Sequence, residues 1–173
     1  MKPLPIGKSN FKQLIEEGCY YVDKTQSIEE LFENGSKIIL FPRPRRFGKS
    51  LFMSMLNNFF DIDKKEENKE LFKDLYISKS PYYKELNTYP TIFLNFKDLK
   101  SDNYESAFYM FRSRIAELYR NKSYVFEVLD DEEKEKFNRL KSEKGTFDDY
   151  KESLKLLSTW LERYHKEKVI ILI

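Results

Sequence analysis

The chain has 173 residues, enough for one domain with a hydrophobic core and too few for two. Hydrophobic residues make up 40% of it and aromatic residues 16%, and this share of core-forming side chains excludes a disordered chain. The 31 basic side chains nearly cancel the 29 acidic ones. The resulting net charge of +2 gives no overall field that would require a nucleic acid or an acidic membrane as partner.

Cysteine and histidine are too scarce to form disulfides or a Cys/His metal site. The single cysteine, Cys19, excludes an internal disulfide, and one Cys with one His excludes a metal site of the Cys/His type. The N-terminus lacks the apolar run of a signal peptide, and nowhere do about 18 apolar residues occur together, so no membrane partner is expected. The sequence therefore predicts a cytoplasmic protein.

Two short helices are predicted before residue 36. The first is expected from Asn10 to Glu17, capped by Ser9 or Asn10 and ended by Gly18. The second is expected to begin at Ser27, because Ser27 and Glu30 have the spacing of a capping box. Gly35 closes this helix about two turns later. We treat residues 1–36 as an N-terminal helical extension.

A buried strand is predicted directly after this extension. The run Lys37 to Phe41 is apolar and rich in β-branched residues, as in strands of parallel sheets that are covered on both faces. From Ser50 onward a helix is predicted, because apolar residues recur every three to four positions through Phe60. The charged stretch 61–70 that follows is predicted to be a surface connection with little structure of its own.

The rest of the chain alternates between strand and helix patterns. Strands are predicted at 91–96 and at 169–173, with helices over 104–118, 130–141 and 150–164 between them. Alternation of this kind predicts an α/β fold with a parallel sheet and right-handed crossovers.

Chemistry is concentrated in the loop between the first predicted strand and its helix. Gly48 allows a backbone to approach an anion without a side chain in the way, and the first amides of the helix carry unpaired hydrogens and the positive end of the helix dipole. Lys49 would reach the β and γ phosphates of a nucleotide, and the Ser50 hydroxyl would ligate Mg²⁺. A strand–loop–helix context with Gly-Lys-Ser is what a phosphate-binding loop requires.

The motif by itself is degenerate. The full phosphate-loop pattern has glycine five residues before Gly48, where this sequence has Arg43. A Gly-Lys-Ser/Thr triplet arises by chance in roughly one chain in twelve of this length. From the triplet and its context alone, a basic surface turn remains the alternative.

A longer stretch of the sequence resembles a known family. The run Phe41-Pro42-Arg43-Pro44-Arg45-Arg46-Phe47-Gly48-Lys49-Ser50 resembles the loop of the bacterial and archaeal AAA-ATPase-like family, whose members read Arg-Pro-Arg-Arg-Phe-Gly-Lys-Ser/Thr. Further likenesses are Leu4-Pro5-Ile6-Gly7, Tyr20-Tyr21-Val22-Asp23-Lys24-Thr25 and Tyr89-Pro90-Thr91-Ile92-Phe93-Leu94. Together they extend over nearly the whole chain, and in this family arginine at position 43 is normal.

The resemblance implies a P-loop nucleotide-binding fold of the additional-strand type, related to the STAND ATPases. The expected architecture is an incomplete three-layer α/β sandwich with a parallel sheet, and residues 37–173 form its core. It implies ATP and Mg²⁺ as ligands, with Ser50 at the metal. The residues it assigns to the nucleotide are Arg45, Arg46, Phe47, Gly48, Lys49, Ser50 and Leu51.

The resemblance also implies what the chain would need for catalysis. In the family, the Asp-Glu pair called Walker B follows a strand like 169–173, and the Asp helps to hold Mg²⁺ while the Glu polarises the attacking water. We therefore expect this chain to be a fragment that binds ATP without hydrolysing it alone. Its expected partner is an effector domain, often nuclease-like of the PD-(D/E)XK type, whose state the nucleotide would switch.

Three alternatives stay open. The basic loop from Arg43 to Lys49 could instead make the chain a nucleic-acid-binding module, although the near-neutral net charge counts against this. A purely structural domain with a vestigial loop would bind neither ligand. The segment Asp23-Lys24-Thr25 either approaches the adenine side of the site, as in related ATPases, or forms a turn and helix cap.

Overall fold

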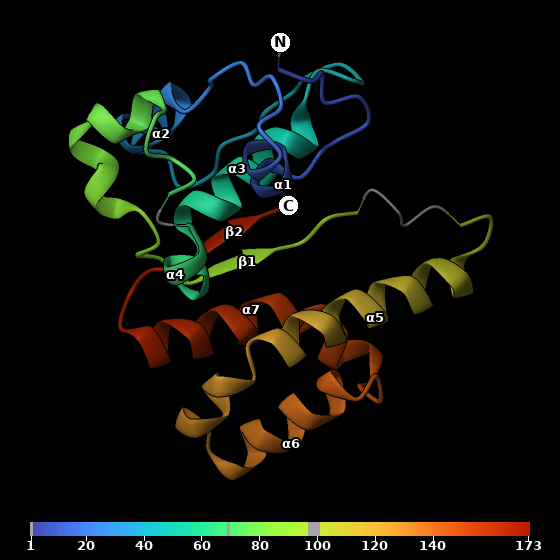
Figure 1. Cartoon of the computed structure of the whole chain (residues 1–173). Coiled ribbons are helices and arrows are strands. Elements are labelled where there is room, and N and C mark those ends of the chain that lie inside the picture. The colour runs from blue at the N-terminus through green and yellow to red at the C-terminus, as the bar shows by residue number, and fades with distance from the viewer. Residues whose placement is uncertain (1, 69, 97–100) are drawn as a thin grey trace. The chain divides into compact units, whose positions relative to one another are not determined.

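The computed structural model describes residues 2–68, 70–96 and 101–173, and the chain divides into two compact units (Figure 1). Unit 1 is Met1–Thr91 and unit 2 is Ile92–Ile173. The boundary lies inside the core that the sequence predicts for residues 37–173. The predicted division at residue 36 stays a prediction.

Unit 1 is built around one central helix. Its α-helices are α1 (Phe11–Glu16), α2 (Gln26–Asn34), α3 (Lys49–Phe60) and α4 (Lys65–Asn68), and its 3-10 helices are Ile62–Lys64, Tyr76–Lys79 and Pro81–Glu85. Helix α1 packs on α3, where the Phe11 amide donates to the Ser54 hydroxyl at 3.0 Å. The ring of Phe11 stacks on Phe72 at 5.0 Å, and Phe72 meets the edge of Phe59 at 5.4 Å. Burial of these rings provides the apolar core of the unit.

Unit 2 combines a small sheet with three long helices. Its elements are β1 (Thr91–Phe93), α5 (Tyr104–Asn121), a 3-10 helix (Ser123–Val128), α6 (Asp131–Lys141), α7 (Phe147–His165) and β2 (Ile170–Leu172). Strands β1 and β2 form a parallel pair, and the Leu94 amide donates to the Leu172 carbonyl at 2.8 Å. The core centres on the fully buried Trp160, against which Tyr119 and Phe137 pack.

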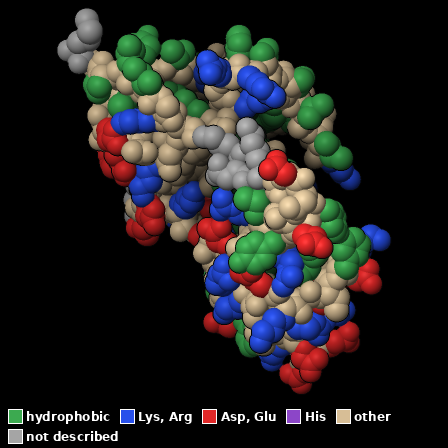
Figure 2. All heavy atoms as spheres, turned by 90° about the vertical axis from the view of Figure 1, so that its right-hand side faces the viewer, with side chains coloured by type: hydrophobic (Ala, Val, Ile, Leu, Met, Phe, Trp, Pro, Cys, Tyr) green, Lys and Arg blue, Asp and Glu red, His purple; other side chains and the backbone are tan. Residues whose placement is uncertain are grey.

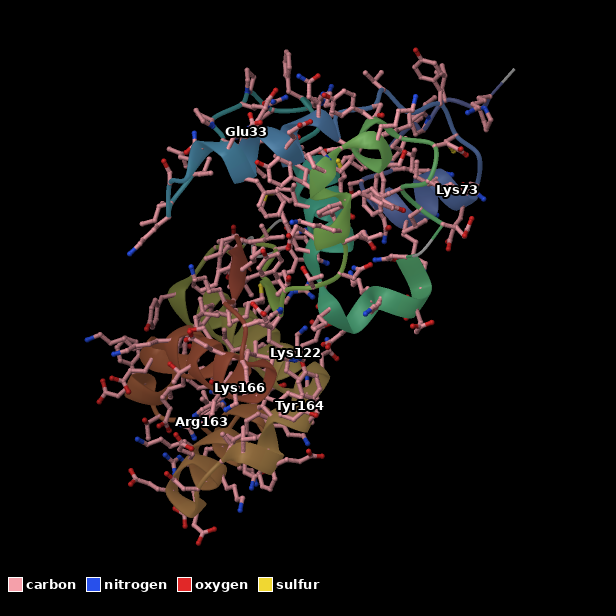
Figure 3. The ribbon with its side chains drawn as sticks, turned by 90° about the vertical axis from the view of Figure 1, so that its left-hand side faces the viewer. Glu33, Lys73, Lys122, Arg163, Tyr164 and Lys166 are labelled. Atoms are coloured by element: carbon pink, nitrogen blue, oxygen red, sulfur yellow. The ribbon has the colours of Figure 1, made fainter. Side chains whose placement is uncertain are left out.

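Two fork-shaped ion pairs fasten the helices of unit 2. Arg163, labelled in Figure 3, lies at the end of α7. Its guanidinium donates to both carboxylate oxygens of Glu133, at 2.6 and 2.9 Å, and so joins α7 to the start of α6. Arg139 donates in the same way to Asp149, at 3.0 and 3.1 Å, and joins the end of α6 to the start of α7. Both acids also close capping boxes at the helix that each begins, so each carboxylate satisfies a helix end and a cation at once.

The α/β class is confirmed, and the strands predicted at 91–96 and 169–173 exist over shorter ranges. The predicted strand Lys37 to Phe41 is wrong for the described chain, because this segment belongs to no sheet there. Ile38 is 89% exposed and Leu40 84% exposed. A strand needs a neighbouring strand to receive its backbone hydrogen bonds, and no described strand does so for this segment. Hydrophobic side chains accordingly gather on the surface of unit 1 (Figure 2).

Smaller differences concern helix starts. Ser27 lies inside α2, whose N-cap is Thr25, so the predicted capping box with Glu30 does not begin this helix. The Ser27 hydroxyl donates to the Lys24 carbonyl at 2.6 Å instead. The stretch 61–70 holds two short helices where an unstructured connection was expected. Of the described helices, none is both long and apolar enough to cross a membrane.

The ion pairs predict how unit 2 responds to acid. Hydrogen bonds from Arg163 lower the pKa of Glu133 from 4.5 to about 2, and those from Arg139 lower the pKa of Asp149 from 3.8 to about 2. A carboxylate whose pKa is lower in the folded state stabilises the fold above its unfolded value, and the stabilisation is lost as the pH falls toward the folded value. We expect the melting temperature to fall between pH 4.5 and pH 2.

The variant Asp149→Asn tests this cause. At neutral pH it should lose about 1.5–3 kcal/mol of stability, the range for a hydrogen bond to a charged group. Its melting temperature should then decline less steeply with acid. Asp148→Asn is the matched control, because Asp148 is exposed. Melting curves by circular dichroism from pH 7 to pH 2 measure both effects, and an unchanged acid response in Asp149→Asn would refute the assignment.

Candidate phosphate-binding site

The loop before α3 turns sharply through two left-handed residues. Gly48 is the N-cap of α3 with φ 74° and ψ 19°, and Arg46 has φ 67°. Glycine adopts this conformation freely, whereas for arginine it is uncommon. Left-handed residues next to a helix start bring successive backbone amides to one concave side, where they can hold an anion.

The first turn of α3 leaves its amides open. The first bond inside this turn runs from the Phe52 amide to the Gly48 carbonyl, at 2.9 Å. No side chain caps the helix, and its first turn contains no acidic residue. Within the described residues, no acceptor meets the amides of Lys49, Ser50 or Leu51. These donors and the positive end of the helix dipole together favour a negatively charged ligand.

Lys49 is held inside the curve of its own loop. Its ammonium donates to the Arg43 carbonyl at 2.8 Å, so the chain from 43 to 49 closes around it. Two contacts to Phe52 fasten the start of the loop to α3: the Phe41 ring meets it edge-on at 5.0 Å, and the Arg43 guanidinium lies 5.8 Å from its centre. Position 43 thus contributes a backbone carbonyl and a cation–π contact, and neither requires glycine there.

The predicted site residues divide into two groups. Gly48, Lys49, Ser50 and Leu51 lie at the start of α3, and their contacts with a nucleotide stay predictions. Arg45, Arg46 and Phe47 form the exposed turn before it, and Phe47 is 61% exposed. Their predicted contacts with a nucleotide stay predictions. The left-handed backbone of Arg46 had no signal in the sequence, because arginine rarely adopts it.

The loop suits phosphates better than a free metal ion. In the described part of the chain, no group of three His, Cys, Asp or Glu side chains could hold a metal, and no carboxylate is bonded to this loop. The Ser50 hydroxyl is half-buried and has no described partner. Since Mg²⁺ is commonly bound through substrate phosphates and few protein ligands, the residues fit a magnesium ion that arrives with the nucleotide.

The segment Asp23-Lys24-Thr25 braces unit 1. Asp23 accepts from the amide and hydroxyl of Thr25, both at 2.8 Å, and from the Tyr76 amide at 2.6 Å. The Thr25 hydroxyl accepts from the buried Ile77 amide at 3.1 Å. These contacts support the turn-and-cap interpretation. The sequence pattern did not predict the brace, because its partners lie more than 50 residues away.

The brace gives a stability prediction. Thr25 is fully buried, so Thr25→Val keeps its shape but leaves the Ile77 amide without an acceptor. We expect a loss of about 1–3 kcal/mol in the free energy of unfolding, measured by urea titration. Ser27→Ala is the control, since that hydroxyl bonds only the local Lys24 carbonyl. Equal stability of Thr25→Val and the wild type would contradict the brace.

Comparison with known proteins defines the class. Residues 5–173 match the AAA-ATPase-like family, described as "Predicted AAA-ATPase". The chain belongs to this family, as its loop motif indicated.

One relative is a protein of Azotobacter chroococcum described as "Uncharacterized protein in vnfD 5'region". It is 43% identical over 77 residues, a stretch that covers 44% of this chain and 14% of that protein. The matched stretch thus spans a small part of the relative's length. No solved structure gives a significant match.

Proposed function

We propose that the chain is an ATP-binding module of the P-loop type, with the phosphates bound by the loop from Arg43 to Leu51. The observation that carries the proposal is the start of α3, where three amides have no acceptor among the described residues, behind a left-handed Gly48, and where Lys49 bonds back to its own loop. The family match supports a nucleotide as the anion. The three-layer P-loop sandwich is part of the proposal.

Each residue would have a distinct task. The amides of Lys49 to Leu51 would receive phosphate oxygens, because they point out of the helix start with no competing acceptor. Lys49 would exchange the Arg43 carbonyl for phosphate oxygens, which as charged acceptors form the stronger bond. The Ser50 hydroxyl would hold Mg²⁺, whose charge offsets that of the phosphates, and Arg45 with Arg46 would add guanidinium donors from the exposed turn.

We propose binding by this chain rather than hydrolysis. The first turn of α3 contains no acidic residue, and among the described hydrogen bonds none joins a carboxylate that could activate water to this loop. The physiological role we propose is a nucleotide-dependent switch for an attached effector domain, of nuclease-like type. The family assignment and the open helix start support this proposal, and the effector stays a prediction.

Mutation of Lys49 tests the nucleotide proposal. Lys49→Ala removes a charged donor worth about 1.5–3 kcal/mol, so Mg²⁺-ATP affinity should fall by roughly 10- to 150-fold, measured by calorimetry. Lys37→Ala is the matched control, because this exposed lysine lies outside the loop. Equal affinity of Lys49→Ala and the wild type would contradict the proposal.

The same preparations separate the nucleic-acid alternative. A module that binds DNA or RNA through Arg43, Arg45 and Arg46 should lose affinity steeply with added salt, in proportion to the phosphates neutralised. A nucleotide site built on helix amides should keep its preference for Mg²⁺-ATP over single-stranded DNA at 0.2 M salt. At this concentration the Debye length is below about 8 Å, so attraction between more distant exposed charges is largely screened. Tighter binding of DNA with a steep salt slope would favour the alternative.

A further inference from the structure

The buried residue Asn87 makes three hydrogen bonds at the C-terminal end of α3. The Asn87 amide donates to the Phe59 carbonyl at 2.7 Å. Its side-chain nitrogen donates to the carbonyls of Asn58 and Asp61, at 2.9 and 2.8 Å. The last carbonyls of a helix have no partner within the helix. Here Asn87 donates to two of them, those of Asn58 and Phe59, and to the carbonyl of Asp61 just after the helix.

The neighbouring residue extends this connection. The Tyr89 amide donates to the Phe60 carbonyl at 3.1 Å, and the Tyr89 carbonyl accepts from the Ile62 amide at 2.9 Å. A parallel bridge pairs Tyr89 with Asp61. We call residues 87–89 the α3 joint. Five hydrogen bonds hold it, three to carbonyls of the last turn of α3 and two to the residues that follow, Asp61 and Ile62. Strand β1 begins two residues further along the chain.

Asn87 occupies a position at which a polar side chain costs free energy. It is 1% exposed, its φ of 53° lies in the left-handed region, and its side-chain oxygen is buried without a hydrogen-bond partner among the described residues. A left-handed backbone and an unmatched buried oxygen both cost free energy. The orientation of the amide is fixed, because its nitrogen faces two carbonyls. Asn87 therefore carries a local cost that its bonds to α3 offset.

We propose that Asn87 is a positioning residue that couples the phosphate site at one end of α3 to the α3 joint at the other. The inference rests on the proposed nucleotide function. Helix α3 has 12 residues, and every hydrogen bond along it helps to hold its first amides in place. Local opening of the joint frees the last carbonyls of α3 and frays the helix from that end. A ligand that needs an intact helix start must therefore oppose this opening.

The coupling has a measurable size. A ligand that binds only the closed state stabilises it in proportion to its occupancy, and at a concentration 100 times Kd the open population falls by up to about 100-fold. Amide hydrogens of the joint exchange through the open state, so Mg²⁺-ATP should slow their exchange. For residues 86–93 of the wild type, we expect exchange to slow by about tenfold. This is less than the limit of 100-fold, because some openings of the joint leave the start of α3 intact and so do not compete with the ligand.

Hydrogen exchange of the full chain, read by mass spectrometry with and without saturating Mg²⁺-ATP, tests the proposal. Asn87→Gly retains the left-handed backbone but removes the two side-chain bonds, so the ligand effect on residues 86–93 should fall below about twofold. Asn68→Ala is the matched control. Its side chain donates to the same Asn58 carbonyl at 2.7 Å, and its loss leaves the joint bonded. This variant should lose stability yet keep the tenfold response.

Calorimetry on the same samples separates the two proposals. Binding by the wild type without slower exchange at 86–93 would overturn the coupling alone, as would a full response in Asn87→Gly. An absence of binding would overturn the nucleotide proposal and this inference with it. If circular dichroism shows Asn87→Gly to be unfolded, Asn87→Asp replaces it. In this variant a carboxylate oxygen, which can only accept, takes the place of the side-chain nitrogen that donates to the two carbonyls. A full response in Asn87→Asp would equally overturn the coupling.

Discussion

The two ends of helix α3 solve the same backbone problem in opposite ways, and the candidate site depends on this difference. A helix leaves amides unpaired at its start and carbonyls unpaired at its end. At the end of α3, Asn87 and Tyr89 satisfy the carbonyls from within the protein. At the start, neither a side-chain cap nor an acid neutralises the amides, and the loop holds a lysine beside them. The helix is thus anchored at one end and available for a ligand at the other.

Unit 2 reaches its stability by a different route. Helices α6 and α7 each carry an acid in the first turn that serves two partners at once, a backbone amide and the fork of an arginine from the other helix. These pairs surround a core of aromatic rings centred on Trp160. Arg139 and Arg163 hold helices of this unit together, whereas Arg45 and Arg46 lie exposed on the loop of unit 1.

Local patterns predicted the helices well because helix signals are short-range. Asn10, one of the two predicted caps, caps α1, Gly35 ends α2 in the left-handed conformation, and the helix predicted at 130–141 is found as α6. The loop could also be located from sequence, since Gly-Lys-Ser needs only its immediate context. The long-range bonds of Thr25 and Asn87 could not be predicted, because their partners lie 26 to 52 residues away and leave no periodic pattern.

The predicted strand at 37–41 failed for a related reason, since strand formation depends on neighbours that a local pattern does not contain. This failure has a practical consequence. The segment presents Ile38 and Leu40 to solvent, and in the described structure no strand pairs with its backbone. Exposed aliphatic stretches with free edges nucleate aggregation, because identical copies can stack edge to edge. In concentrated solution, this segment is therefore a place where copies of the chain can associate.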